Sequence, residues 1–417
     1  MSRRIFVTYA LSPPFVSAMN LNVIELTQQL VRIPSLNPMG RTVLGPEFLE
    51  TRLTNHLQQL AESLGFPCER HTVLPGRDNL VVGLPNRSAL AAAAPIILLE
   101  VHQDTVPVDG MTIDPFAGEL RDGRIWGRGA CDVKGGMAAM WCVMEQLARD
   151  PAARDLNVVL ACTINEENGF DGIRHVCQLW QHNRSALLPR PPHWAIVAEP
   201  TELDVVVAHK GTVRWRCRTT GKAAHSSNPA AGDNAVYRMA HVLTALENYA
   251  ESGLPAAPEH PLLGGSTLSV GTIHGGISVN TVPDECTIEI DRRLLPGESS
   301  DVAWQHACDY VTQRLGPHKI IQDEPFLRSP GLPADRNSEL AQRLSEVIRE
   351  HGHLGKQIGV PFGTDAGILA AAGIPAVVFG PGSIQQAHTH DEWIDTSSLE
   401  QACAVLTSFC QSCPTST

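Results

Sequence analysis

Short apolar runs that end directly in polar residues recur through the first half of this chain, and they limit the folds it can adopt. Three such runs lie at residues 95–101, 157–163 and 195–198, and a helical pattern at 137–148 separates the first two. Nearly continuous apolar runs of this length are typical of strands that are covered on both faces. Their alternation with helices predicts an α/β fold with a mostly parallel sheet. In such sheets functional residues lie just outside the carboxyl ends of the strands.

Helical periodicity identifies further elements. The spacing predicts helices over Asn22–Ile33, which Pro34 ends, and over Gly45–Leu64. By the same criteria we expect a strand at 79–84, a helix at 338–351, a strand at 376–379 and a closing helix at 399–413.

The stretch from Val205 to Gly316 has a different pattern. Apolar and polar residues alternate at 213–219, 267–273 and 286–294, and a helix is expected over 233–249. Such alternation predicts strands with one covered face, so we expect an α+β insert with a sheet and two helices. A chain of 417 residues is long enough for two domains. The predicted boundaries are 20–204 and 317–417 for the two parts of the α/β domain and 205–316 for the insert.

Composition excludes several classes of function. Hydrophobic residues make up 43% of the chain and charged residues 18%, which suits a folded globular protein. The formal net charge is −12 and no basic stripe is present, so no nucleic-acid partner is expected. No run of about 18 apolar residues occurs, so no membrane partner is expected either.

The eleven cysteines are scattered, without the regular spacing of a disulfide framework. Most, such as Cys142 and Cys162, lie in apolar stretches, which predicts buried thiols in a reducing, cytoplasmic compartment. Cys410 and Cys413 form a single C-x-x-C, and a zinc ribbon would need a second pair.

The first 20 residues resemble a weak secretory leader, with Arg3 and Arg4 ahead of an apolar stretch. Pro13 and Pro14 break that stretch early. We therefore interpret Met19 as an alternative first residue.

The polar residues that follow two of the strands suggest metal binding. His102 and Asp104 are two residues apart and share a strand face, so the Asp could orient the imidazole toward a metal. Glu166 and Glu167 end a buried strand, where adjacent carboxylates repel unless a cation or a proton neutralises them. Each pair alone could be an ordinary polar loop, and the argument rests on their combination.

A glycine-rich segment carries another acidic residue, Asp132, within GRGACDVKGG at 127–136. Its glycines let the backbone approach a bulky group closely. Lys134 raises the idea of a phosphate-binding loop, but the segment lacks the G-x-x-x-x-G-K-[ST] pattern, which excludes a P-loop.

Taken in order, these clusters resemble the motifs of the two-zinc amidohydrolases that include acetylornithine deacetylase, succinyl-diaminopimelate desuccinylase, aminoacylase and carboxypeptidase G. The motifs are HQDTVP at 102–107, GRGACDVKGG at 127–136, Glu166-Glu167, Glu199-Pro200-Thr201 and QAHTHDEW at 386–393. The resemblance covers nearly the whole chain beyond its first 20 residues. It implies a catalytic domain that is interrupted by a smaller lid and dimerisation domain.

The resemblance also implies five metal ligands. His102 and Glu199 would bind one ion, Glu167 and His388 would bind the other, and Asp132 would bridge both. Carboxylates and neutral imidazoles suit Zn²⁺, two per subunit, with Co²⁺ or Mn²⁺ as possible substitutes. Two dications with three carboxylates leave a net positive charge, which would stabilise an anionic intermediate.

Further roles follow from the same resemblance. Asp104 would be the hydrogen-bonding partner of His102, and Glu166 the general base that deprotonates water and returns the proton to the leaving amine. The Asp132–Val133 peptide bond is expected to be cis. His390 remains an alternative to His388 as the ligand.

The insert matches the family at substrate-side positions. His225, in GKAAHSSNP, would reach a neighbouring subunit's site and stabilise the oxyanion, which implies a homodimer. Asn280 and Arg293 match residues that hold substrate, and a surface ion pair is the alternative for Arg293. Gly363 and Thr364, in PFGTDAG, would also lie near the ligand.

These features predict a metal-dependent hydrolase that cleaves the amide bond of a small N-acyl amino acid, similar to acetylornithine deacetylase or succinyl-diaminopimelate desuccinylase. A dipeptidase or carboxypeptidase on the same scaffold is the alternative. A non-catalytic metal-binding protein is a remote one, because the expected base Glu166 is present.

Overall fold

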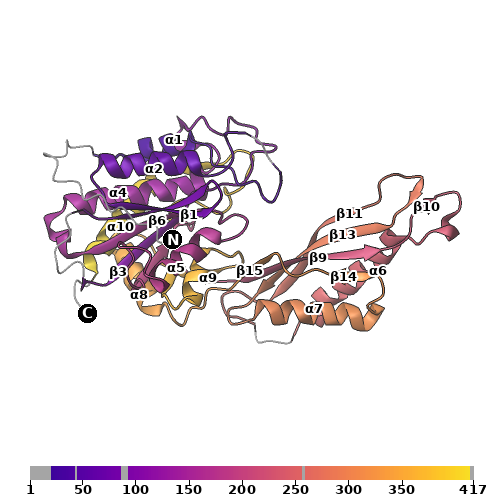
Figure 1. The fold of residues 1–417 in the computed structure, drawn as a ribbon. Coiled ribbons are helices and arrows are strands. Elements are labelled where there is room, and N and C mark those ends of the chain that lie inside the picture. Colours follow the sequence, from indigo (N-terminus) through magenta and orange to yellow (C-terminus); the bar gives the residue numbers. More distant parts are fainter. Residues whose placement is uncertain (1–19, 43–44, 86–92, 256–258, 414–417) are drawn as a thin grey trace, which may run out of the picture.

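The computed structural model describes residues 20–42, 45–85, 93–255 and 259–413. The expectation about Met19 and the N-terminal leader lies outside these ranges. The described chain forms a large body around one sheet and a smaller body that extends away from it (Figure 1). No helix among the described residues is long and apolar enough to cross a membrane.

The large body contains an eight-stranded sheet. Its strands, in spatial order, are β1 (Cys68–Leu74), β2 (Arg77–Gly83), β6 (Asn157–Thr163), β3 (Ile96–His102), β7 (Trp194–Val197), β17 (Ala376–Val378), β8 (Val205–His209) and β16 (Gln357–Val360). The central strands β6, β3, β7 and β17 are mutually parallel. Their carboxyl ends therefore meet at one edge of the sheet.

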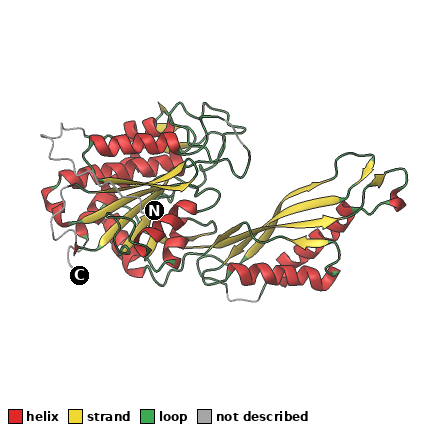
Figure 2. Ribbon diagram, in the orientation of Figure 1, coloured by secondary structure: helices red, strands yellow, loops and turns green. Residues whose placement is uncertain are grey.

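Helices cover both faces of this sheet (Figure 2). One face packs against α1 (Val23–Val31), α2 (Thr51–Ser63), α4 (Gly135–Arg149), α8 (Ser338–Glu350) and α10 (Thr396–Ser412), and the other against α5 (Asp171–Gln181) and α9 (Asp365–Ala371). In β3, Ile97 and Leu99 belong to the first core and Ile96 and Leu98 to the second, as the two-residue period of a strand requires. Burial on both faces explains the nearly continuous apolar run.

The predicted second helix is too long at its start. α2 begins at Thr51, whereas the prediction began at Gly45. Leu49 has a φ of 65°, in the left-handed region, which is incompatible with a continuous α-helix through this segment.

The smaller body is a sheet covered on one face by two helices. Its strands are β11 (Thr267–Gly275), β13 (Glu285–Leu294), β9 (Gly211–Thr220), β14 (Ile320–Gln322) and β15 (Leu327–Ser329), and its helices are α6 (Ala235–Asn248) and α7 (Ser300–Leu315). In β13 every second residue, including Ile288 and Ile290, is buried in the core formed with the helices. A short two-stranded antiparallel sheet of β10 (Ala224–His225) and β12 (Thr281–Val282) lies at the far tip (Figure 1).

The limits of the insert that follow from strand pairing differ from the predicted ones. The valine-rich segment Val205–His209 pairs with β16 in the large sheet, and β14 and β15, which follow the predicted end at residue 316, pair with β9 in the small sheet. Val205–His209 is buried along its whole length, as expected of a strand in the large sheet rather than of an open-faced one. The segment that forms the smaller body thus runs from Gly211 to Ser329.

A three-stranded sheet joins two distant parts of the large body. It consists of β4 (Glu119–Arg121), β5 (Arg124–Trp126) and β18 (Trp393–Asp395). Trp126 pairs with Trp393, so the glycine-rich segment after β5 lies beside the residues that precede β18.

Candidate metal centre

The five expected metal ligands lie at the carboxyl edge of the large sheet. His102 is the last residue of β3, Glu167 follows β6, and Glu199 follows β7. Asp132 lies in the turn ahead of α4, and His388 lies between β17 and β18. Parallel strands thus bring together side chains that are far apart in the sequence.

The glycine-rich segment forms a tight turn at Ala130–Lys134, ahead of α4. Gly129 has a φ of 81°, and a Cβ there would lie 2.7 Å from Thr105 Cγ2, so glycine is required for both conformation and space. The Asp132–Val133 peptide bond is cis, as predicted.

The ligand atoms form two groups that share Asp132. His102 Nε2 lies 3.2 Å from Asp132 Oδ1 and 3.8 Å from Glu199 Oε1. His388 Nε2 lies 3.2 Å from Asp132 Oδ2 and 3.3 Å from Glu167 Oε2. Within each group all ligand atoms lie within 4.8 Å of one another. Each oxygen of Asp132 therefore faces a different group, which is the geometry of a bridging carboxylate.

The charges of this cluster fit a pair of cations. Burial raises the pKa of Glu199 well above its usual value, and the negative charge of Asp132 raises it further. Hydrogen bonds to Asp132 and Glu167 raise the pKa of His388 to about 11. Glu167 Oε1 is buried and lacks a hydrogen-bond partner among the described residues. Protons on the histidines thus offset part of the negative charge of the carboxylates, which two dications would neutralise. The donor set of imidazole and carboxylate suits Zn²⁺ or a similar ion.

Asp104 contacts both the imidazole of His102 and the backbone of the Glu166–Glu167 turn. The Nδ1 of His102 lies 2.8 Å from the backbone oxygen of Asp104 and 3.7 Å from its carboxylate. The carboxylate instead accepts hydrogen bonds from the backbone N–H groups of Glu166 and Glu167, at 3.1 and 3.2 Å, and from Asn37 Nδ2 at 2.7 Å. Asp104 therefore positions the Glu166–Glu167 turn, while its carbonyl orients the imidazole so that Nε2 faces Asp132.

Glu166 lies beside the ligand groups but belongs to neither of them. Burial raises the pKa of its carboxyl well above the usual value; His102 opposes this, and the nearby Asp365 and Glu167 add to it. A carboxyl with a raised pKa at the edge of a metal cluster suits the transfer of a proton.

His390 belongs to neither ligand group of the described residues. Its imidazole packs over Gly110, where an added Cβ would lie 3.5 Å from Nε2. Its backbone oxygen accepts a hydrogen bond of 2.9 Å from Thr112 N–H. The geometry favours His388 as the ligand.

Two expected substrate-side residues lie far from the ligand groups within one chain. His225 lies in β10 and Asn280 directly precedes β12, at the tip of the smaller body (Figure 1). His225 is exposed, and its Nδ1 lies at a hydrogen-bond distance of 2.7 Å from Ser227 Oγ. The structure of a single chain therefore does not bring His225 or Asn280 to the metal centre.

The other three expected substrate-side residues, Arg293, Gly363 and Thr364, lie nearer the junction between the two bodies. Arg293, in β13, pairs with Thr212 at the start of β9, and its Nε lies 2.8 Å from Asp291 Oδ1, the ion pair considered as its alternative role. A Cβ on Gly363 would lie 3.3 Å from the backbone oxygen of Lys210, between β8 and β9. Thr364 is buried, and its hydroxyl caps α9 by accepting a hydrogen bond from Ala366 N–H.

The structure adds buried carboxyls that the sequence interpretation did not assign. Glu100, in β3, accepts a 2.6 Å hydrogen bond from Thr163 Oγ1, which also lies 3.4 Å from Asp365 Oδ2. Burial raises the pKa of Glu100 to about 7. The sequence signal for Glu100 was its charge within an otherwise apolar predicted strand. Glu392 is also fully buried, and it lies within the QAHTHDEW motif.

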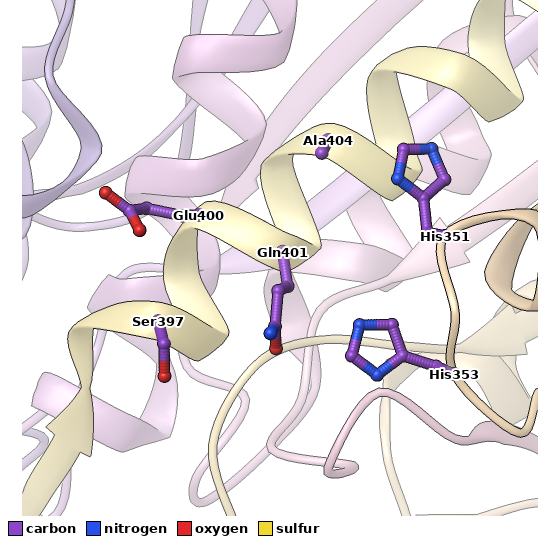
Figure 3. A pocket seen from close by; sticks show the side chains of 6 residues that line it. All are labelled: His351, His353, Ser397, Glu400, Gln401 and Ala404. Atoms are coloured by element: carbon purple, nitrogen blue, oxygen red, sulfur yellow. The ribbon is translucent and has the colours of Figure 1, made fainter.

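A hollow elsewhere on the large body lies between α10 and the loop after α8 (Figure 3). His351 and His353 line it, but Glu400 points away from both imidazoles. These residues do not form a ligand group in the described part of the chain.

Comparison with known proteins agrees with this geometry. The profile of "Peptidase family M20/M25/M40" matches residues 98–412. Acetylornithine deacetylase of Vibrio cholerae is 31% identical over 350 residues, which are 82% of this chain and 86% of that protein.

Solved structures share the fold. The M20 family metallo-carboxypeptidase of Sulfolobus solfataricus superimposes with a TM-score of 0.74 at 18% identity, over 93% of this chain and 98% of that one. A tripeptidase of Staphylococcus aureus gives a TM-score of 0.71 at 22% identity, over 94% and 99% of the two chains. The chain belongs to the peptidase family M20/M25/M40 and is a metal-dependent amide hydrolase.

Proposed function

We propose that this enzyme removes the acyl group of small N-acyl amino acids, with acetylornithine-like compounds as the first candidates. The arrangement of two ligand groups around Asp132, with Glu166 beside them, carries the proposal. The similarity to acetylornithine deacetylase over 82% of the chain supports the deacylase branch.

The catalytic residues act on a water molecule and an amide. Two bound dications, Zn²⁺ as the first candidate and Co²⁺ or Mn²⁺ as substitutes, would lower the pKa of the water and polarise the scissile carbonyl. Glu166 accepts the proton as the water oxygen attacks the carbonyl carbon. The C–N bond then breaks, and Glu166 delivers that proton to the amine nitrogen. The products are the carboxylic acid and the amine, which at neutral pH ionise to a carboxylate and an ammonium ion.

Asp104 makes this proton transfer possible by holding the backbone of Glu166. Because the Glu166 N–H donates to a buried carboxylate, the base cannot move away from the ligand groups without breaking that hydrogen bond. The neighbouring Glu167 is fixed in the same way. One buried side chain thus sets the separation between the base and a metal ligand.

Substrate binding is proposed to involve both bodies. The guanidinium of Arg293 would bind the α-carboxylate, and Gly363 and Thr364 would line the same side of the site. His225 and Asn280 would come from the second subunit of a homodimer, where His225 would stabilise the oxyanion and Asn280 would hold the substrate. Their exposure at the tip, far from the metal centre of their own chain, favours a role across the interface.

The dimer is proposed to form through the smaller body. β11 is an edge strand of the five-stranded sheet, and its residues 271–275 are exposed. An exposed edge offers unpaired backbone groups to another chain. Ile273, 52% exposed, adds apolar surface on the same strand.

A panel of substrates tests the proposed function. The protein is assayed with N-acetyl amino acids, N-succinyl amino acids and dipeptides, with added zinc. We expect hydrolysis of N-acyl amino acids, abolition by a chelator, and recovery on addition of zinc or cobalt. Turnover that persists after complete removal of metal would refute the mechanism.

A dipeptidase or carboxypeptidase is the second candidate function. The structures of a carboxypeptidase and a tripeptidase share the fold. Preferential hydrolysis of the dipeptides in the same panel would select this alternative.

All eleven cysteines are free, which supports the proposed cytoplasmic location.

A further inference from the structure

One fully buried carboxylate, that of Glu392, accepts hydrogen bonds from three backbone N–H groups in and just before the turn that carries Asp132, and from the side chain of Arg128. Its Oε1 accepts from the backbone N–H groups of Cys131 and Asp132, at 2.9 and 3.0 Å. Its Oε2 accepts from Gly129 N–H at 3.0 Å and from Arg128 Nη1 at 2.6 Å. Every contact is a donor, which is the environment of a carboxylate rather than of a carboxylic acid.

The segment that contains Glu392 also contains His388, a member of the ligand group with Glu167. Glu392 follows His388 by four residues, and the backbone oxygen of Thr389 accepts a 3.3 Å hydrogen bond from Arg128 Nη2. Gly127 N–H donates to the backbone oxygen of Glu392 at 2.9 Å. These contacts continue the pairing of β5 with β18, so the turn with Asp132 and the loop with His388 form one hydrogen-bonded unit.

This unit has little freedom to relax. Arg128 is 3% exposed and Glu392 is fully buried, so a lost hydrogen bond there cannot be replaced by bulk water. Glu392 holds the backbone N–H groups of Cys131 and Asp132, and so fixes the backbone from which the bridging carboxylate projects. A shift in this turn would therefore move Asp132 away from the other ligands of both groups.

We propose that Glu392, with Arg128, is a positioning residue that sets the affinity of the centre for its pair of metal ions. Glu392 does not touch a metal in this account. It fixes the backbone of the bridging ligand and its distance from the His388 loop. The proposal rests on the proposed function only in that both require two metal ions at Asp132.

The test is the zinc affinity of Glu392→Gln, measured by competition with a chromophoric chelator. A glutamine amide would point N–H groups at two donors, so the turn has to move. We expect the zinc dissociation constant to rise about 10- to 100-fold, the range for residues that orient metal ligands. Because the defect is one of affinity, excess zinc should restore much of the turnover.

Glu69→Gln is the matched control. Glu69, in β1, likewise accepts from backbone N–H groups, those of Ala186 and Leu187 at 2.8 and 3.3 Å, but it belongs to neither ligand group. Its zinc affinity should equal that of the wild type. A folded Glu392→Gln protein with wild-type zinc affinity would overturn the proposal.

Arg128→Lys covers the case in which Glu392→Gln does not fold. Lysine keeps the charge but cannot donate to Glu392 Oε2 and to the Thr389 oxygen through a planar fork. We expect zinc affinity to fall several-fold, about 3- to 10-fold on the same reasoning. Unchanged affinity would then reject the positioning role. A wild-type protein that binds two zinc ions but hydrolyses none of the panel would reject the proposed function alone.

Discussion

Glu166 and Glu167 are adjacent in the sequence but have separate roles in this account. Glu167 belongs to the ligand group with His388, whereas Glu166 belongs to neither group. Both backbone N–H groups donate to Asp104, so the two carboxyls diverge from one fixed turn. A substitution at either residue should therefore separate metal binding from proton transfer.

Glu166→Gln should retain both metal ions and lose turnover. The amide keeps the size of the side chain but cannot accept and return a proton, so we expect kcat to fall about 10²- to 10⁴-fold. Metal content by elemental analysis, beside steady-state kinetics, checks the prediction. Glu167→Gln is the comparison variant, and it should lose metal. Loss of metal from Glu166→Gln would show that its assigned role is wrong.

Metal uptake should release protons at neutral pH. The pKa of His388 is raised to about 11 in the metal-free cluster by Asp132 and Glu167, so its imidazole is protonated at pH 7. A metal ion binds only the neutral imidazole, so binding displaces that proton, and affinity rises as pH rises. Calorimetric titration with zinc in buffers of different ionisation enthalpy measures the release. An affinity independent of pH between 6 and 8 would contradict this charge assignment.

At the scale of elements, a buried polar network connects the loop after β6 to β2 and to the start of α2. Arg77, in β2, forms an ion pair with Glu50, just ahead of α2, and its Nη1 donates to Asn165 Oδ1 at 2.9 Å. Asn37 Nδ2 donates to the same oxygen at 2.8 Å and also to Asp104. The network connects strand, helix and loop to the turn that holds Glu166.

Glu50→Gln should destabilise the fold strongly. The ion pair with Arg77 is buried, and removing one charge leaves the other unpaired, which costs about 3–5 kcal/mol of unfolding free energy. Denaturant unfolding of metal-free protein measures the change. The control is Glu339→Gln, at an exposed i,i+4 pair with Arg343 on α8, which should cost less than about 0.5 kcal/mol. Equal effects of the two substitutions would count against the network.

Local patterns predicted many elements of the large body, and the resemblance to the amidohydrolases implied the ligand set. The strand expected at Asn157–Thr163 has the same limits in the structure, because an apolar run bounded by polar residues marks a buried strand well. The short strand β16 was not predicted, since Gln357–Val360 has too few residues for a period to show. Val205–His209 was assigned to the insert because sequence does not reveal which sheet a buried strand joins. Glu392 was quoted only within a motif, because its four donors come from residues about 260 positions away.

At the scale of the whole molecule, the two bodies place His225 at a distance from the metal centre of its own chain (Figure 1). Arg293 and Gly363 lie nearer the junction, so one chain supplies only part of the proposed substrate site. A symmetric dimer would complete two such sites at once.

Mixing two inactive variants tests this arrangement. His225→Ala and Glu166→Ala subunits are each expected to have little activity. If His225 acts on the partner, a mixed dimer has one complete site, and random mixing should restore about a quarter of wild-type activity. Recovery is measured after the subunits are dissociated and reassociated together. No recovery, in samples where mixed dimers are shown to form, would place His225 outside the partner's site.

The central claim is that two dications bind on either side of Asp132, and anomalous diffraction at the zinc edge tests it most directly. Crystals of the zinc-loaded protein should show two peaks about 3.5–4 Å apart. One peak should lie beside His102 and Glu199, and the other beside Glu167 and His388. A single peak, or peaks away from Asp132, would contradict the account.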